Sequence, residues 1–534
     1  MSSIIVKART GLARGQARQA ASWSSALHLR TLKGRLILQA SLILLFAAIL
    51  TWAGANTFSR ASSDLATIDS GSIPSVNYAQ TITQDIETID AQSADYLATA
   101  GLTTTHPCAI PTDLSGDTTT VTLTNHACDE RDIDAETVQA NQTLFLAANN
   151  VTYTGEQTAV ERTTIGLEGY LADIHQMRVD FGLAANKTDP TDPYLKQAYQ
   201  AYLNASNILH NHISLDTITA NQIRLDKERV APGAPLPECT LANGQTLSAS
   251  QWTQGSLTNA LDCLSSINYT HLQGAYTDSG NFLGASTAWI AILCSLLFLL
   301  LAFGTVSMMV RSHRVLNLGL LAATLISLIF SGTTIGLLRS LQGTSDTHSQ
   351  DGAFVQLVSD DYQSVYDAAV LKRVATDANA DESRWLIALE FNDQANISHW
   401  QNDWNQNVAQ VNSLIRNAHG NQTWNEEIAP LSAMDANWNN YYAFDNNIRS
   451  AAQNQSDPKR LLTAENISTG DSNTSFGQFT NAVDQLAQAN QDHYNQTFDS
   501  INGTLMTYFV LSLILFPLIG LLALGGIALR LKDF

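Results

Sequence analysis

Four apolar stretches dominate the pattern of hydrophobic and polar positions along this chain. They cover residues 36–55, 288–310, 315–338 and 505–529, and none of them contains Asp, Glu, Lys or Arg. Each holds about twenty or more residues, the length that a helix needs to cross roughly 30 Å of hydrocarbon. The pattern therefore predicts an integral membrane protein with four transmembrane helices.

Two long polar blocks, residues 56–287 and 339–504, lie between the first and second spans and between the third and fourth. Apolar residues recur in both blocks at intervals of three and four, which is typical of amphipathic helices. The fold class is therefore all-α: four transmembrane helices root two extracytoplasmic helical bundles, and no residue-level repeat between the bundles is apparent. The expected helices are 82–97, 133–148, 157–183 and 193–228 in the first block, and 352–379, 381–418, 424–450 and 472–502 in the second.

The distribution of charge predicts the orientation of the spans. Residues 1–35, the hinge 311–314 and the tail 530–534 together carry eleven of the 28 basic residues and one of the 48 acidic residues. The positive-inside rule then places both termini and the hinge in the cytoplasm and both blocks outside. An acidic exterior also argues against nucleic-acid binding, because it repels phosphate. The residues assigned to topology or cytoplasmic coupling are Arg30, Lys33, Arg35, Arg311, Arg314, Arg530 and Lys532.

The first span allows one alternative. Ala53, Gly54 and Ala55 have the small-residue spacing of a signal-peptidase site after a basic leader and an apolar run. The run is long for a signal core, and the helical pattern continues beyond Ala55. We therefore expect a retained span, with cleavage after Ala55 as the alternative.

Four of the five cysteines lie in the first block, which fits an oxidising exterior. Each neighbouring pair brackets a turn-rich insertion, so we expect the disulfides Cys108–Cys128, around a short hairpin, and Cys239–Cys263. The fifth, Cys294, lies in the second span and is predicted to pack as a small apolar residue.

A zinc site is the alternative for the first cysteine pair. His106 precedes Cys108 by two residues and His126 precedes Cys128 by two, which supplies the two His and two Cys ligands of a tetrahedral site. Outside the cell, however, a disulfide would consume the thiols first. We therefore expect neither a resident metal nor a cofactor.

Sequence signatures of catalysis are mostly missing. The chain contains no phosphate-binding GxxxxGK[ST] loop, no GxGxxG turn, no HExxH helix and no GxSxG elbow. The spans also lack the ionisable residues that transporters usually place at mid-membrane. We therefore expect a protein that is not an enzyme.

A family resemblance is carried by residues 72–80 and 89–97, by residues 166–170 with the following Arg178, and most specifically by residues 311–324 at the hinge and the start of the third span. In these stretches the chain resembles actinobacterial GlnX-like four-span membrane proteins. The likeness covers most of the chain, whereas the two cysteine-bearing insertions and the long basic start depart from it. The resemblance implies a relay between an extracytoplasmic glutamate/aspartate-binding lipoprotein and a cytosolic Ser/Thr kinase.

The main hypothesis is therefore a non-enzymatic sensor or signal-relay protein of the plasma membrane. One alternative is a structural or scaffold subunit of a cell-envelope complex. Another is a chemoreceptor-like sensor that binds a small molecule directly, with Arg162 or Arg178 gripping a carboxylate. The expected partners are the lipid bilayer, the solute-binding lipoprotein and the kinase, while assembly into a homo-oligomer is left open.

Overall fold

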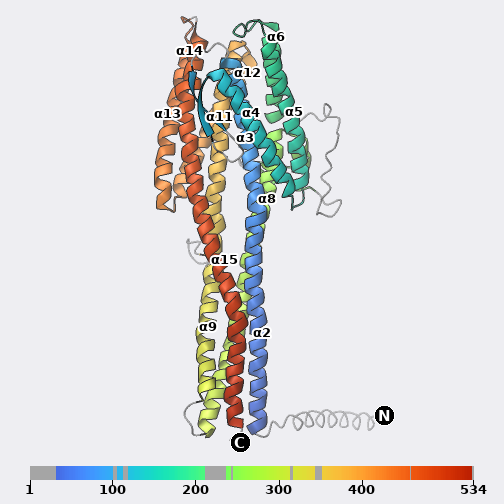
Figure 1. Cartoon of the computed structure of the whole chain (residues 1–534), viewed down its shortest axis with the longest axis vertical. Helices are drawn as coiled ribbons and strands as arrows, with labels where there is room; N and C mark the ends of the chain where they lie inside the picture. Colours follow the sequence, from blue (N-terminus) through green and yellow to red (C-terminus); the bar gives the residue numbers. More distant parts are fainter. Residues whose placement is uncertain are drawn as a thin grey trace, which may run out of the picture. The chain divides into compact units, whose positions relative to one another are not determined.

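The computed structural model describes residues 32–99, 105–111, 118–210, 236–241, 245–312, 317–342, 352–457 and 459–531. The chain divides into two compact units, and Figure 1 labels their longer helices. The apolar unit comprises Met1–Ala66, Tyr276–Gln356 and Thr497–Phe534, and the polar unit comprises Thr67–Ala275 and Leu357–Gln496.

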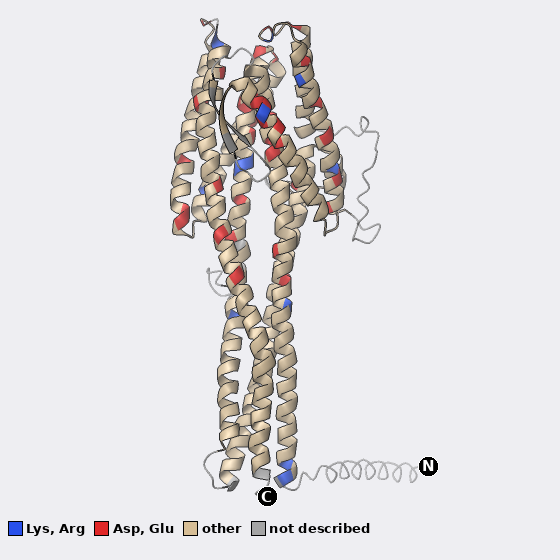
Figure 2. Ribbon diagram, in the orientation of Figure 1, with Lys and Arg blue, Asp and Glu red and all other residues tan. Residues whose placement is uncertain are grey.

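Four helices supply the apolar unit: α2 (Leu32–Thr67), the C-terminal part of α8 (Leu257–Ser312), α9 (Leu318–Gln342) and the C-terminal part of α15 (Asn473–Leu531). All four contain a stretch that is long and apolar enough to cross a membrane, at the places that the sequence pattern predicted. Figure 2 shows that these stretches contain almost no charged residues. Large apolar side chains are exposed along them, for example Trp289 (65%) and Phe303 (68%), and suit contact with lipid.

Small residues pack the apolar unit together. A Cβ at Gly54 of α2 would lie 2.9 Å from Ser512 Oγ of α15, and one at Gly319 of α9 would lie 3.1 Å from Gly526 Cα of α15. Asn317 Nδ2 also donates a hydrogen bond to the Gly526 carbonyl oxygen at 2.9 Å. Small residues allow such close approach of transmembrane helices, which no hydrophobic effect drives together in lipid. Gly54, part of the alternative cleavage motif, is thus a packing residue.

The first block enters the polar unit through a π-helical segment, η1 (Ile68–Ser72), followed by α3 (Ile73–Ala98) with Pro74 in its first turn. Two antiparallel hairpins interrupt the helices, β1 (Thr105–Pro111) with β2 (Thr118–Thr124), and β3 (Cys239–Thr240) with β4 (Thr246–Leu247). The remaining helices are α4 (Asn125–Asn149), α5 (Glu156–Leu183), α6 (Pro193–His210), α7 (Ala249–Thr253) and the start of α8. Of the helix predicted over 193–228, the part beyond His210 lies outside the described residues.

The second block has a similar order of elements. These are α10 (Ala353–Val355), η3 (Gln356–Tyr362), α11 (Gln363–Glu390), α12 (Gln394–Gly420), η4 (Asn425–Glu427), α13 (Ile428–Gln453), α14 (Arg460–Ile467), η5 (Ser468–Ser472) and the start of α15. The helix break predicted between 379 and 381 is wrong, because α11 continues to Glu390. The chain instead turns at Asn392, whose φ is 54°, and Asp393 caps α12 by accepting a hydrogen bond from the backbone N–H of Asn396 at 3.3 Å.

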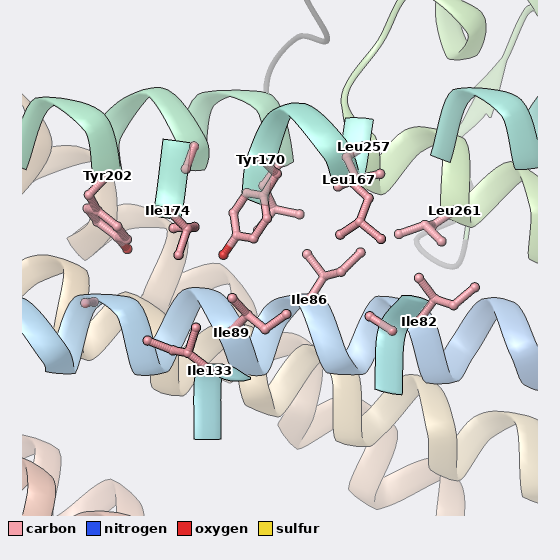
Figure 3. Packing of buried hydrophobic residues seen from close by; sticks show 14 of the residues in the cluster. Ile82, Ile86, Ile89, Ile133, Leu167, Tyr170, Ile174, Tyr202, Leu257 and Leu261 are labelled. Atoms are coloured by element: carbon pink, nitrogen blue, oxygen red, sulfur yellow. The ribbon is translucent and has the colours of Figure 1, made fainter. Parts of the chain in front are cut away.

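Each block retains an apolar core of its own. In the first block, Ile82 and Ile86 of α3 face Leu167 and Tyr170 of α5, and Leu261 of α8 lies beside them (Figure 3). The core of the second block gathers aromatic and aliphatic residues of α11, α12, α13 and α15. Its largest members are Trp404, Trp438, Tyr441 and Phe479.

The two blocks nevertheless fold as one compact unit. Helix α3 of the first block packs along α11 of the second, and Ile387 of α11 joins the core of the first block. Both helices bury charged residues as well as apolar ones, among them Asp90 on α3 and Arg384 on α11. These charged positions lie between the two blocks.

The two blocks also share a residue-level repeat, and the expectation of no such repeat was therefore wrong. The pattern Asn-x-Thr-aromatic-x-x-Glu occurs at 150–156 and again at 421–427. In both copies one carboxylate oxygen of the final glutamate accepts hydrogen bonds from the backbone N–H groups four and three residues earlier. The distances are 2.6 and 2.9 Å for Glu156 and 2.7 and 2.8 Å for Glu427.

A second pair of segments extends this repeat. Residues 258–271 (TNALDCLSSINYTH) and 480–493 (TNAVDQLAQANQDH) share seven of fourteen positions. The final histidine of each segment stacks on the aromatic residue of the first motif. Tyr153 stacks on His271 with an interplanar angle of 8° and Trp424 on His493 with one of 9°, both with ring centroids 4.1 Å apart.

Two disulfides lie in the first block, with the pairing expected from the sequence. Cys108 of β1 is bonded to Cys128 of α4, and Cys239 of β3 to Cys263 of α8. The thiols that the zinc alternative requires are therefore consumed, and His126 Nδ1 lies 2.9 Å from the Tyr96 carbonyl oxygen. The first disulfide ties the hairpin to α4, and the second holds β3 against α8.

Candidate functional site

The most unusual group in the polar unit is the guanidinium of Arg384, which is only 1% exposed. Its Nε donates a hydrogen bond to Asp90 Oδ2 of α3 at 2.7 Å. Its Nη1 donates to Asp377 Oδ1 at 2.7 Å and to Asp381 Oδ1 at 2.8 Å. Asp377, Asp381 and Arg384 lie on one face of α11 because their spacing follows the helical period. Local helix geometry thus assembles three of these four residues on α11, and α3 supplies Asp90.

The remaining donor of Arg384, Nη2, faces two further groups. It lies 2.9 Å from His210 Nε2 at the end of α6 and 3.5 Å from Glu87 Oε2 of α3. Because a guanidinium only donates hydrogen bonds, His210 Nε2 must accept, and the imidazole is neutral. Burial, together with the positive charge of Arg384, lowers the pKa of His210 to about 4.

Aromatic groups enclose the pair of Arg384 and Asp90. Tyr170 OH donates to Asp90 Oδ1 at 3.3 Å, and Tyr202 OH donates to Asp90 Oδ2 at 3.2 Å. The ring of Trp400 covers the guanidinium carbon of Arg384 at 5.0 Å from its centroid, a cation–π contact. Asp90 is therefore fully hydrogen-bonded although it has no exposure to solvent.

Negative charge exceeds positive charge around Arg384. Four carboxyl groups, those of Glu87, Asp90, Asp377 and Asp381, lie within 4 Å of this single guanidinium. Burial, reinforced by the neighbouring Asp377, raises the pKa of Glu87 and of Asp381 well above the ordinary range. Burial also acts to raise the pKa of Asp377, but Arg384 outweighs it and holds that pKa below its ordinary value. The cluster is therefore suited to bind additional protons or a cation.

A cavity of about 120 Å³ borders this cluster. Its lining includes Glu87, His210 and Asp377, together with Asp262 of α8 and Arg373 of α11. Arg373 and Asp262 form an ion pair with each other. The side chain of Asp377 is 25% exposed, so the cluster has an edge that reaches solvent.

A second group of buried acids lies where α3, α11 and α14 meet. Burial raises the pKa of Asp95 to about 6, of Glu382 to about 8 and of Glu465 to about 9. Ser468 Oγ donates to Glu382 Oε1 at 2.6 Å, and Asn473 Nδ2 donates to Asp95 Oδ2 at 3.4 Å. At pH 7 the carboxyl groups of Glu382 and Glu465 are thus held largely in their neutral form.

The two arginines that the sequence suggested for ligand binding lie elsewhere. Arg178 of α5 pairs with Glu130 at 2.8 Å and with Asp134 at 2.6 Å, both on α4. Its guanidinium is therefore engaged in an ion-pair network at the protein surface. Arg162 is partly exposed sixteen residues earlier on α5, which separates it from Arg178 by about 24 Å along the helix.

The basic residues assigned to topology are described only in part. Lys33 and Arg35 lie in the first turn of α2, while Arg311 and Arg530 lie in the last turns of α8 and α15. Arg30, Arg314 and Lys532 lie outside the described residues.

The Arg384 cluster was not predicted from the sequence. One signal was available: Asp377, Asp381 and Arg384 follow each other at intervals of four and three, which places them on one face of a helix. The predicted helix break at Ala380 prevented us from recognising this shared face, because it placed Asp377 and Arg384 on different helices. The partner Asp90, 294 residues away from Arg384, could not be identified by spacing.

Comparison with known proteins returned no match, whether with protein-family models, curated proteins or solved structures.

Proposed function

We propose that this protein is a non-enzymatic sensor that relays an extracytoplasmic signal across the membrane. The observation that carries the proposal is the charged contact between α3 and α11, through which the two polar blocks meet in one compact unit. Removing one member of a buried ion pair is costly, whereas the intact pair adds little net stability over apolar packing. Such a contact is consistent with a protein in which the first and second polar blocks shift relative to each other during signalling.

The size of the required change is modest. A shift of roughly 1–3 kcal/mol between two arrangements of the polar unit would suffice to couple two sites. In the proposal, a solute-binding lipoprotein docks on the polar unit outside the cell. A cytosolic Ser/Thr kinase reads the change through the basic segment 1–35. Both partners follow from the family resemblance, and the orientation follows from the positive-inside rule.

Reporter fusions test the orientation first. Fusions at residue 20, at Ser312 and at the C-terminus are expected to report cytoplasm, and fusions near Gly244 and Asn421 are expected to report the exterior. An external N-terminus, or a mature chain beginning at Asn56, would contradict the retained first span.

The relay itself is tested in cells, by measuring phosphorylation of the kinase's substrates with and without extracellular glutamate or aspartate. Charge reversal at Arg30, Lys33 or Arg35 is expected to weaken the response while membrane insertion stays normal. Reversal of the exposed Lys196, which lies on α6, is the matched control. A response that survives every reversal and deletion of residues 2–28 would exclude the N-terminal segment as the route. A response that also survives deletion of the whole protein would favour the scaffold alternative.

A further inference from the structure

We propose that Glu87, His210 and Asp377 form a binding site for a divalent transition-metal ion of the Zn²⁺ or Mn²⁺ class. The three residues come from three helices, α3, α6 and α11. One ligand atom from each lies within 4.8 Å of the other two. Ligand atoms that bind one ion at about 2.0–2.2 Å cannot be more than about 4.4 Å apart, so small side-chain adjustments complete the site.

The second observation is an unsatisfied oxygen. Glu87 is 2% exposed, and its buried Oε2 receives no hydrogen bond from any residue that the structure describes. The nearest cation, Arg384 Nη2, is 3.5 Å away. A buried carboxylate oxygen without a partner is costly, and this one belongs to a residue that lines the cavity of about 120 Å³. An ion in that cavity would satisfy it.

The balance of charge supports the same conclusion. Four carboxyl groups lie around one guanidinium, and the nearby Arg373 is already paired with Asp262. The remaining positive charge must come from protons or from a bound cation. The cavity gives a cation room, and the exposed edge of Asp377 gives it a route from solvent.

The donor set indicates the class of ion. One imidazole nitrogen and two carboxylate oxygens suit Zn²⁺ or Mn²⁺ better than Ca²⁺ or Mg²⁺, which prefer ligand sets made entirely of oxygen. Arg384 occupies His210 Nε2, so the ion takes Nδ1, or takes Nε2 after the guanidinium has turned toward its three aspartates. Either way, the ion would link α3, α6 and α11, and thereby both polar blocks.

The experiment uses the full-length chain in detergent, purified without a histidine tag and stripped with a chelator that is then removed. Titration with ZnCl₂ and MnCl₂ is followed by calorimetry and by metal analysis after gel filtration. We expect one ion per chain. Binding should weaken at least tenfold in Glu87→Gln and His210→Gln, and should be unchanged in the matched controls Glu168→Gln and His175→Gln, whose side chains are exposed on α5.

A second measurement does not depend on the variants folding. The thermal midpoint of the wild-type chain should rise on addition of the ion and return to its starting value on chelation. Binding without stoichiometry, equal affinity in Glu87→Gln and Glu168→Gln, or an unchanged wild-type midpoint would each overturn the proposal. The assay contains no kinase or lipoprotein, so its outcome is independent of the relay function.

Discussion

The two polar blocks share the same local structural motifs, but they contribute different residues to the contact between them. Both have a glutamate-closed turn, at Glu156 and at Glu427, and an aromatic–histidine stack. When α3 and α11 are aligned on Ser75 and Ser364, however, Arg384 takes the position of Asp95. One helix thus presents an acid where its counterpart presents the central base. The repeated turn and the repeated stack stabilise each block internally, whereas α3 and α11, which have diverged at this position, form the contact between the blocks.

A pair of aspartates departs from this division, because one of these repeated residues forms an ion pair with the other block. Asp262 and Asp484 occupy equivalent positions in the repeated segments 258–271 and 480–493. Both form ion pairs with α11, Asp262 with Arg373 and Asp484 with Lys372 at 2.7 Å. Equivalent acids of the two blocks therefore converge on adjacent bases of a single helix. The asymmetry makes α11 the helix on which disruption should have the largest effect.

Arg384→Met should destabilise the polar unit more than any other single change considered. It leaves four carboxyl groups facing an apolar side chain, and loss of one partner of a buried ion pair costs about 3–5 kcal/mol. Denaturant unfolding of the detergent-solubilised chain, followed by tryptophan fluorescence, measures the loss. Arg162→Met on α5 is the control. Equal midpoints for the two variants would show that the contact between the blocks does not depend on Arg384.

Removing the disulfide Cys239–Cys263 by a double serine substitution should cost about 3 kcal/mol, because an open loop of this size gains chain entropy when unfolded. The effect should be confined to the first block. Hydrogen exchange should therefore accelerate in α5 and the start of α8, and stay slow in α12 and α13. Cys294→Ala, which alters the free buried cysteine of α8, serves as the control. Equal acceleration in both blocks would mean that they unfold as one.

The glutamates of the repeated turns should behave alike. Glu156→Ala and Glu427→Ala each leave two backbone N–H groups without their acceptor, at a cost of about 1–3 kcal/mol. Glu427→Ala should cost more, because Asn490 Nδ2 also donates to Glu427 Oε1 at 2.9 Å. Unfolding midpoints compared with the exposed Glu426→Ala measure both. A glutamate whose loss has no effect would show that its turn does not depend on the repeated pattern.

The sequence predicted those features that depend on composition or local spacing. The four spans follow from unbroken apolar runs, and the cysteine pairings follow from the short loops that they close. The helix break near Ala380 was wrong because α11 continues to Glu390, and the actual turn at Asn392 depends on a positive φ. The pairing of Arg384 with Asp90 escaped prediction because helical periodicity gives the face of a residue but not its partner.

The smallest expected effect concerns pH, at the acids where the blocks meet. Burial, with Glu390 and Asp95 nearby, raises the pKa of Glu465 from 4.5 to about 9. Between these values the folded chain holds a proton that the unfolded chain releases, so stability must fall as pH rises. The slope is about 1.4 kcal/mol per pH unit for this one group.

Glu465→Gln carries no titrating proton and should lose less stability than the wild type between pH 7 and pH 8. Glu168→Gln should keep the wild-type slope. Identical slopes in all three proteins would mean that Glu465 is already ionised in the folded state. The contact between the blocks would then contain a buried negative charge at Glu465. In that case the stability of this contact would not depend on pH through Glu465, and the contact would not differ in this respect from the repeated turns within each block.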